Sequence, residues 1–143
     1  MERTIRKIDE TMNEAIRDKI TQRRHQIMVH SCIYYQHNTN IIDDHTYDRW
    51  AMELGDLHAQ YPAEAKAAEM AKEFEGFTKE TASGFDLAYH DPRTVRKAAW
   101  LIEFHKEQIK RGAQFNESPF LFVLYYEYYR FPCIQYFVLV LLP

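Results

Sequence analysis

The sequence predicts an all-α protein, with a helical hairpin, two further helices and a hydrophobic C-terminal tail whose form is left open. Apolar residues recur at three- and four-residue steps along much of the chain, which is the period of a helix. The 143 residues include only 4 Gly and 5 Pro, too few for a turn-rich β protein. Charged residues make up 27% and hydrophobic residues 46%, which favours a folded core over disorder.

Two long helices are expected to form the hairpin, over residues 4–37 and 44–60. A break of the first helix near Thr21 and Gln22 is left open. Asp43 or Asp44 is expected to cap the second helix, because a carboxylate there satisfies free N–H groups and suits the helix dipole. The apolar stripe of the first helix begins with Ile5, Ile8, Met12, Ala15, Ile16 and Ile20. Short loops would then pack the two helices antiparallel.

A third and a fourth helix are expected to cover this hairpin. Pro62 suits the first turn of a third helix over residues 63–74, which are rich in Ala, Glu and Lys. Residues 75–90 contain two glycines and predict a loop. An Asp-Pro pair then begins a fourth helix over residues 93–110, and a glycine ends it.

The composition changes sharply near residue 115, so we expect a helical domain over 1–115 and a separate tail over 116–143. The charged residues of the tail are Glu117, Glu127 and Arg130. Three interpretations stay open: a membrane anchor, two β-strands over 120–126 and 135–142, or a segment outside the evolved domain, such as a shifted reading frame. Any membrane contact would come through this tail.

Charge and cysteine content exclude several classes of protein. The net charge of −3 argues against a strongly basic nucleic-acid binder, so direct DNA binding is expected to be weak or absent. Two cysteines, Cys32 and Cys133, cannot supply a disulfide framework or a four-cysteine zinc site. The seven histidines lack the spacing of known zinc motifs, and no metal site is expected. The charged N-terminal stretch is unlike a signal peptide, which favours the cytoplasm.

The most informative stretch is VHSCIYYQHNTNIIDDHTYDRWAMELGDLHAQYP, residues 29–62. It contains a tyrosine pair, a short loop, an Asp-x-x-Tyr-Asp-Arg motif, a Leu-x-x-Leu spacing and a final Tyr-Pro. This pattern resembles, without a gap, the N-terminal helical segment of bacterial NAD-dependent DNA ligases. The resemblance covers about a quarter of the chain.

In that family the segment grips the nicotinamide mononucleotide (NMN) half of NAD. Carried over to this chain, the resemblance implies contacts from Tyr34, Tyr35, Asp44, Tyr47 and Asp48. A tyrosine face attracts the cationic nicotinamide ring, and carboxylates accept hydrogen bonds from ribose hydroxyls. The hydroxyl of Tyr35 can donate to a phosphate oxygen, and the helix start near Asp44 places N–H donors close to an anion. Asp44, Tyr47 and Asp48 stand at i, i+3 and i+4, so they share one helix face.

The chain departs from the ligase pattern in two ways. It has Asn38-Thr39-Asn40 where the family commonly has an Asp-x-Pro loop, and it lacks the Lys-x-Asp-Gly motif that accepts the adenylate. No catalytic residue is therefore assigned, and the resemblance implies a binding module rather than a complete ligase. A separate adenylation domain or a DNA-processing protein is the expected partner. Small proteins of this ligase-related kind look like bacteriophage products of DNA replication or repair.

Two plainer interpretations are kept beside this one. The three tyrosines could be core aromatics at helical spacing, and Asp44 and Asp48 could serve only the helix N-terminus. In that case the hairpin is a helical protein- or DNA-interaction module that keeps the scaffold without binding NAD.

Overall fold

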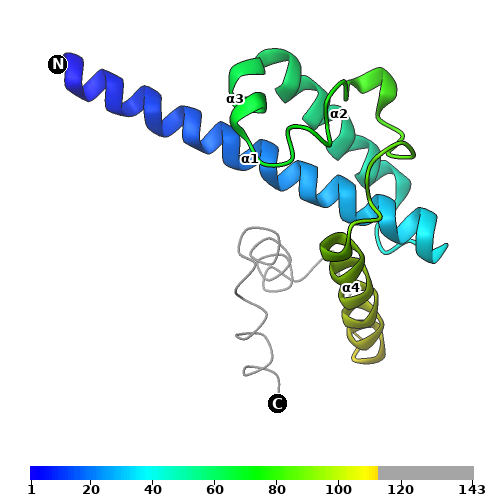
Figure 1. Cartoon of the computed structure of the whole chain (residues 1–143). Coiled ribbons are helices and arrows are strands. Elements are labelled where there is room, and N and C mark those ends of the chain that lie inside the picture. Colours follow the sequence, from blue (N-terminus) through cyan, green and yellow to red (C-terminus); the bar gives the residue numbers. More distant parts are fainter. Residues whose placement is uncertain (113–143) are drawn as a thin grey trace. The chain divides into compact units, whose positions relative to one another are not determined.

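The computed structural model describes residues 1–112, which form four α-helices and one short 3₁₀ helix, with no strand in this part of the chain (Figure 1). The elements are α1 (Glu2–His37), α2 (Asp44–Gln60), α3 (Pro62–Ala67), η1 (Lys79–Thr81) and α4 (Pro92–Lys110). The all-α prediction is confirmed. The predictions for residues 116–143 lie outside the described residues.

Two compact units divide the chain between Ala98 and Ala99, and the features described below belong to the first, Met1–Ala98. Its frame is the hairpin of α1 and α2, and side-chain pairs show that the two helices run antiparallel. Ser31 of α1 contacts Tyr47 near the start of α2, with 3.0 Å between the two hydroxyl oxygens. Arg24, two turns earlier in α1, contacts His58 near the end of α2.

The first helix is continuous over 36 residues, so the break considered near residues 21–22 is wrong. The Thr21 hydroxyl is used in a tertiary contact, because it accepts a hydrogen bond from the Glu69 N–H at 3.2 Å. The helix ends at Asn38, which adopts a left-handed conformation with φ of 50°. The Asn38 N–H then bonds to the Ile33 carbonyl, as in a common helix C-terminal motif.

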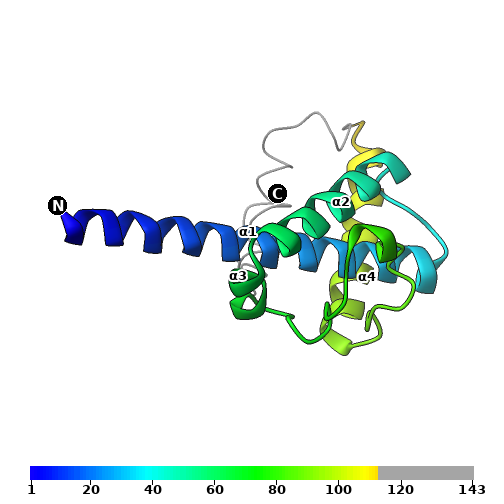
Figure 2. The ribbon, with the colours of Figure 1, turned by 90° about the horizontal axis from the view of Figure 1, so that it is seen from above.

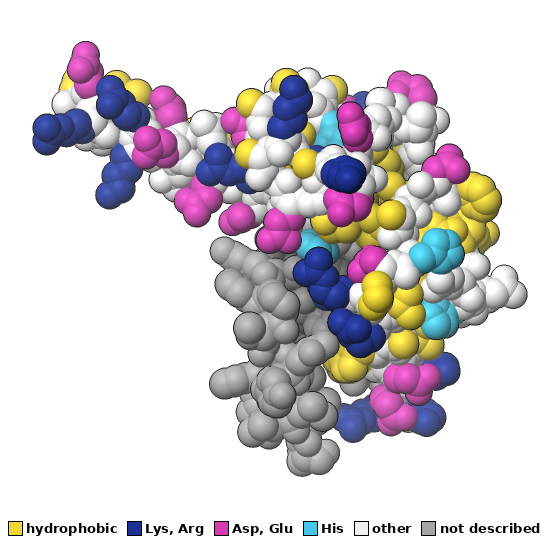
Figure 3. Space-filling view, viewed as in Figure 1, with side chains coloured by type: hydrophobic (Ala, Val, Ile, Leu, Met, Phe, Trp, Pro, Cys, Tyr) yellow, Lys and Arg dark blue, Asp and Glu magenta, His cyan; other side chains and the backbone are white. Residues whose placement is uncertain are grey.

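The N-terminal half of α1 extends beyond the other helices of this unit (Figure 2). Helix α2 has 17 residues, which cover about 26 Å, whereas the 36 residues of α1 extend for about 54 Å. The first three members of the predicted apolar stripe are therefore exposed, with Met12 58% accessible. Lys, Arg, Asp and Glu side chains surround this end of the helix (Figure 3). The buried part of α1 begins at Ile20.

Helix α2 has the bounds that the sequence predicts. Asp43 is its N-cap, and its Oδ1 accepts a hydrogen bond from the Thr46 N–H at 2.6 Å. The apolar face of α2 packs on α1 through Trp50, Ala51 and Leu54, all buried. The Asp43 cap thus stabilises the start of α2, and the contact between Arg24 and His58 joins the end of α2 to α1.

The third helix is shorter than predicted, because it ends at Ala67 rather than near residue 74. Buried Arg24 donates hydrogen bonds to carbonyl groups that would otherwise accept the backbone N–H groups of a longer α3. Its Nη2 donates to the Ala65 carbonyl at 2.7 Å, and its Nη1 donates to the Glu69 carbonyl at 2.7 Å. Tertiary hydrogen bonds thus replace the next turn of helix, and Met70 adopts a positive φ of 60°.

Arg24 also joins α1 to α2 through a histidine. The Arg24 Nη2 lies 3.0 Å from His58 Nε2, and His58 Nδ1 lies 3.2 Å from the Phe77 carbonyl. These contacts require a neutral ring that donates from Nδ1 and accepts at Nε2. Burial lowers the pKa of His58, although its contact with the Phe77 carbonyl acts in the opposite direction. Burial also lowers the pKa of Arg24 to about 10, so the guanidinium stays charged at neutral pH.

Replacing Arg24 should cost more stability than any other charge removal on α1. We expect Arg24→Met to lower the free energy of unfolding by about 2–4 kcal/mol, because several buried carbonyls lose their donor together. Arg6→Met, at an exposed position of the same helix, should change it by less than about 0.5 kcal/mol. Urea titrations followed by circular dichroism measure both. Equal effects of the two substitutions would show that the Arg24 network does not support the fold.

Candidate functional site

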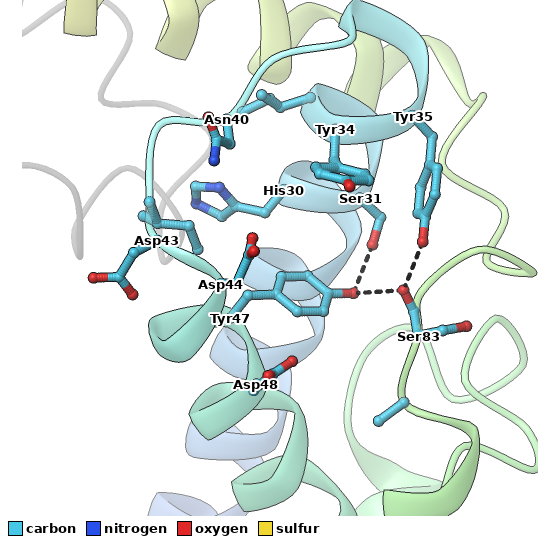
Figure 4. A pocket seen from close by; sticks show the side chains of 13 residues that line it. His30, Ser31, Tyr34, Tyr35, Asn40, Asp43, Asp44, Tyr47, Asp48 and Ser83 are labelled. Atoms are coloured by element: carbon cyan, nitrogen blue, oxygen red, sulfur yellow. Dashed lines mark hydrogen bonds between the residues drawn. The ribbon is translucent and has the colours of Figure 1, made fainter.

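A pocket of about 200 Å³ lies where the last turns of α1 meet the first turns of α2 (Figure 4). Its lining consists of His30, Ser31, Ile33, Tyr34, Tyr35, Asn40, Ile42, Asp43, Asp44, Tyr47, Asp48, Ala82 and Ser83. All five residues that the ligase resemblance singled out are among them. The structure thus brings the five together, and their contact with NAD stays a prediction.

Two tyrosines at the end of α1 form the aromatic wall of the pocket. The Tyr34 and Tyr35 rings meet edge to face, with 5.0 Å between their centroids and 84° between their planes. Tyr35 is supported by Tyr89, on which it stacks at 5.7 Å, and by the edge of Phe85. Tyr34 is 54% exposed, so the core-aromatic interpretation is wrong for this residue. Its ring is accessible to a ligand.

The opposite wall is acidic and belongs to α2. Asp44 and Asp48 are exposed and follow one another at helical spacing, with Tyr47 half-buried between them. Figure 4 shows the Asp43 carboxylate turned away from the pocket, consistent with its role as helix cap. No lysine or arginine from residues 1–112 lines the pocket. The site therefore presents negative charge without a compensating cation in its lining.

The third wall is a short loop around Ser83. The sequence predicts a loop over residues 75–90 but not its contact with the pocket. The Ser83 carbonyl accepts a hydrogen bond from the Tyr35 hydroxyl at 3.1 Å and lies 3.5 Å from the Tyr47 hydroxyl. Ser31 shares a further hydrogen bond with Tyr47 (Figure 4). The predicted donation from Tyr35 to a phosphate is thus replaced in this structure by donation to the protein's own backbone.

Both hydroxyls remain donors at neutral pH. Burial raises the pKa of Tyr47 to about 12, and its contact with Ser31 only partly opposes that shift. Burial and the neighbouring tyrosines also raise the pKa of Tyr35. Neither phenol therefore ionises near pH 7, and the hydrogen bonds to Ser83 persist.

Gly84 allows this loop to approach the tyrosines. Its φ is +72°, a conformation that other residues adopt only with strain, and it is buried. A Cβ added there would collide with the Tyr47 hydroxyl and with the Ser31 Oγ. The glycine was visible in the sequence as a loop residue, but its partners are distant in the chain.

His30 lies at the buried side of the pocket and is only 3% exposed. Its ring is 5.6 Å from that of Trp50, centroid to centroid. Burial lowers the pKa of His30 to about 3, so the imidazole is neutral at pH 7. It adds no positive charge to the pocket.

The comparison with known families is decisive for the first helices. Residues 13–68 match the family described as DNA ligase-like, N-terminal NAD+-binding domain. The predicted resemblance is confirmed for this segment. The ligase-like segment contains most of α1 and all of α2 and α3, and with them the five site residues. The family match supports an NAD+-binding, ligase-like module, in agreement with NAD as the predicted cofactor. No curated protein and no solved structure matched the chain.

The loop that carries Ser83 lies beyond the ligase-like segment. One wall of the pocket is thus supplied by a part of the chain that the family match does not include. The other two walls come from the matched helices.

Cys32 is buried in the core, and burial raises the pKa of its thiol to about 11, which leaves it a weak nucleophile. No three His, Cys, Asp or Glu side chains gather into a metal site within residues 1–112. Over the same residues, no helix combines the length and the apolar character that crossing a bilayer requires.

Changing Gly84 should open the pocket wall. We expect Gly84→Ala to destabilise the protein by about 1–3 kcal/mol, through strain at positive φ and through the collision with Tyr47. Gly76→Ala is the matched control, because Gly76 has a similar φ of +76° but nothing within 4 Å of the added methyl group. Thermal unfolding measures both. If the two variants lose the same stability, the tight contact of Gly84 has no energetic consequence.

Stability should fall as the pH is lowered, partly because of His30. Its folded pKa of about 3 lies below the ordinary histidine pKa of 6.5, so the unfolded chain binds the extra proton. The stability that the neutral His30 provides is complete above pH 6.5 and is lost progressively as the pH falls towards 3. The loss in the free energy of unfolding is about 2 kcal/mol by pH 5. Urea titrations between pH 7.5 and 5 avoid most carboxylate titration. His30→Gln should flatten the profile, and the exposed His37→Gln should leave it unchanged.

Proposed function

We propose that this protein binds the NMN half of NAD in the pocket between α1 and α2, through Tyr34, Tyr35, Asp44, Tyr47 and Asp48. The observation that carries the proposal is that these five residues belong to the ligase-like segment and line one pocket. The resemblance to the ligase family predicts each of them independently of the geometry.

The chemistry of the pocket fits an oxidised nicotinamide. The ring carries a positive charge, and the exposed Tyr34 face offers it a cation–π contact worth about 0.5–2 kcal/mol. Asp44 and Asp48 add electrostatic attraction from the facing helix and can accept hydrogen bonds from ribose hydroxyls. Aromatic and acidic groups on opposite walls thus match a flat cation joined to a sugar.

The size of the pocket also favours half of the dinucleotide. Sites for drug-sized ligands usually measure about 300–1,000 Å³, and this pocket is smaller, at about 200 Å³. The adenylyl half of NAD would therefore lie outside. Because the Lys-x-Asp-Gly motif does not occur in the chain, adenylate transfer would need a separate adenylation domain. Affinity without that domain is expected between about 1 μM and 1 mM.

One observation favours the second candidate, a helical interaction module without NAD binding. The apolar residues Ile5, Ile8 and Met12 are exposed on the extended end of α1. Such a stripe is typical of a helix that packs against another protein. This function does not depend on the pocket, so ligand titration separates the two candidates.

Calorimetric titration tests the proposal directly. NAD and NMN, each at up to about 5 mM, should both give saturable heat with the wild-type chain. Tyr34→Ala should weaken NMN binding about 2- to 30-fold, the range that a lost cation–π contact implies. Adding Asp48→Asn to this variant should weaken binding further.

The matched control is Asp9→Asn, which removes an exposed charge of α1 outside the pocket and should leave binding unchanged. If neither ligand gives heat, or if the double variant binds as the wild type does, the pocket does not bind nicotinamide. The interaction module is then the function that remains.

A further inference from the structure

The pocket lacks the groups that usually bind a phosphate. The phosphate of NMN carries about −1.5 to −2 charges at pH 7, and protein sites commonly meet it with arginine or lysine. Asp44 and Asp48 face this pocket, and within residues 1–112 neither of those cations lines it. His30, the one basic side chain that the described residues bring to the lining, is buried and neutral at that pH. A phosphate inside the pocket would meet repulsion rather than a counter-charge.

The N-terminus of α2, a common place for an anion, already has one carboxylate bonded to an N–H group and a second in its first turn. Asp43 accepts the Thr46 N–H at 2.6 Å, and Asp44 stands in the first helical turn. A carboxylate that already bonds to one N–H group at a helix start repels a second anion there. The cap therefore makes this helix start a weaker place for a phosphate.

The tyrosine hydroxyls are also engaged. Tyr35 donates to the Ser83 carbonyl at 3.1 Å, and Tyr47 lies within hydrogen-bond reach of both Ser83 and Ser31. To bind a phosphate oxygen, these hydroxyls would have to give up contacts that hold the loop in place. This loop lies beyond the ligase-like segment.

The groups that remain available suit a cation and a sugar. Asp44 and Asp48 are exposed acceptors, the ring of Tyr34 is exposed, and Asn40 brings an amide that can pair with the carboxamide of nicotinamide. We propose that the pocket recognises the nicotinamide riboside part of its ligand and leaves the 5′-phosphate in solvent. The free riboside would then bind more tightly than the mononucleotide. This inference rests on the proposed function.

The physical reason is the overall charge of each ligand in the field of the aspartates. Nicotinamide riboside carries +1, whereas NMN carries about −1 because its phosphate outweighs the ring charge. We expect the riboside to bind about 3- to 10-fold more tightly at low ionic strength. The difference should shrink as salt screens the carboxylates, since the Debye length falls from about 30 Å at 0.01 M to about 8 Å at 0.15 M.

The experiment compares three ligands on the full chain by calorimetry at pH 7.5, at about 0.01 M and about 0.15 M salt. The ligands are nicotinamide riboside, NMN and the reduced, uncharged dihydronicotinamide riboside. The proposal predicts that nicotinamide riboside binds most tightly. The affinity of the reduced riboside should be at least about tenfold lower, because this ligand keeps the sugar but lacks the ring charge. Asp44→Asn should reduce the difference in affinity between the riboside and NMN, and Asp9→Asn should leave that difference unchanged.

The outcomes separate this inference from the proposed function. If NMN binds more tightly than the riboside at both salt concentrations, the phosphate is recognised and the inference is overturned, while NMN binding itself survives. If the two ligands bind equally at low salt and Asp44→Asn changes neither, charge recognition is likewise refuted. If no ligand binds, both the inference and the proposed function fail.

Discussion

The site depends on the antiparallel packing of α1 against α2. That packing places the last turns of one helix beside the first turns of the other, so an aromatic pair and an acidic face meet across a gap. The hydrogen bond between Ser31 and Tyr47 marks this crossing at the pocket, and the contact between Arg24 and His58 marks it at the far end. A change in the relative rotation of the two helices would separate the tyrosines from the aspartates.

Arg24 shows how a buried charge can decide local structure. Its guanidinium is only 2% exposed, yet it donates to backbone carbonyls of the segment after α3 and contacts His58 on α2. An unpaired charge at this depth would be costly, so the surrounding chain adopts the turns that supply acceptors. Helix propensity in residues 68–74 is overridden as a result, and the same turns fix the end of the hairpin away from the pocket.

The hairpin could be predicted from local sequence patterns, and the five pocket residues could be predicted from the resemblance to the ligase family. Asp43 and the spacing of Asp44, Tyr47 and Asp48 define the start of α2 and the face that it presents. The contacts of the Ser83 loop could not be predicted this way. Its hydrogen bonds join residues 48 and 36 positions apart, and no periodic pattern encodes such pairs. The short α3 was missed for the same reason, since the side chain that ends it belongs to α1.

The absence of a cation from the pocket lining has a consequence for the partner that the proposed function requires. Transfer of an adenylate from NAD separates NMN from the adenylyl group, and the departing phosphate gains negative charge as the bond breaks. A lining that offers Asp44 and Asp48 cannot stabilise that charge, and Tyr35 already donates to Ser83. The partner would therefore have to bring both the attacking lysine and a basic group at the mouth of the pocket. Under this division of roles, the present chain holds the nicotinamide riboside and its partner handles the phosphates.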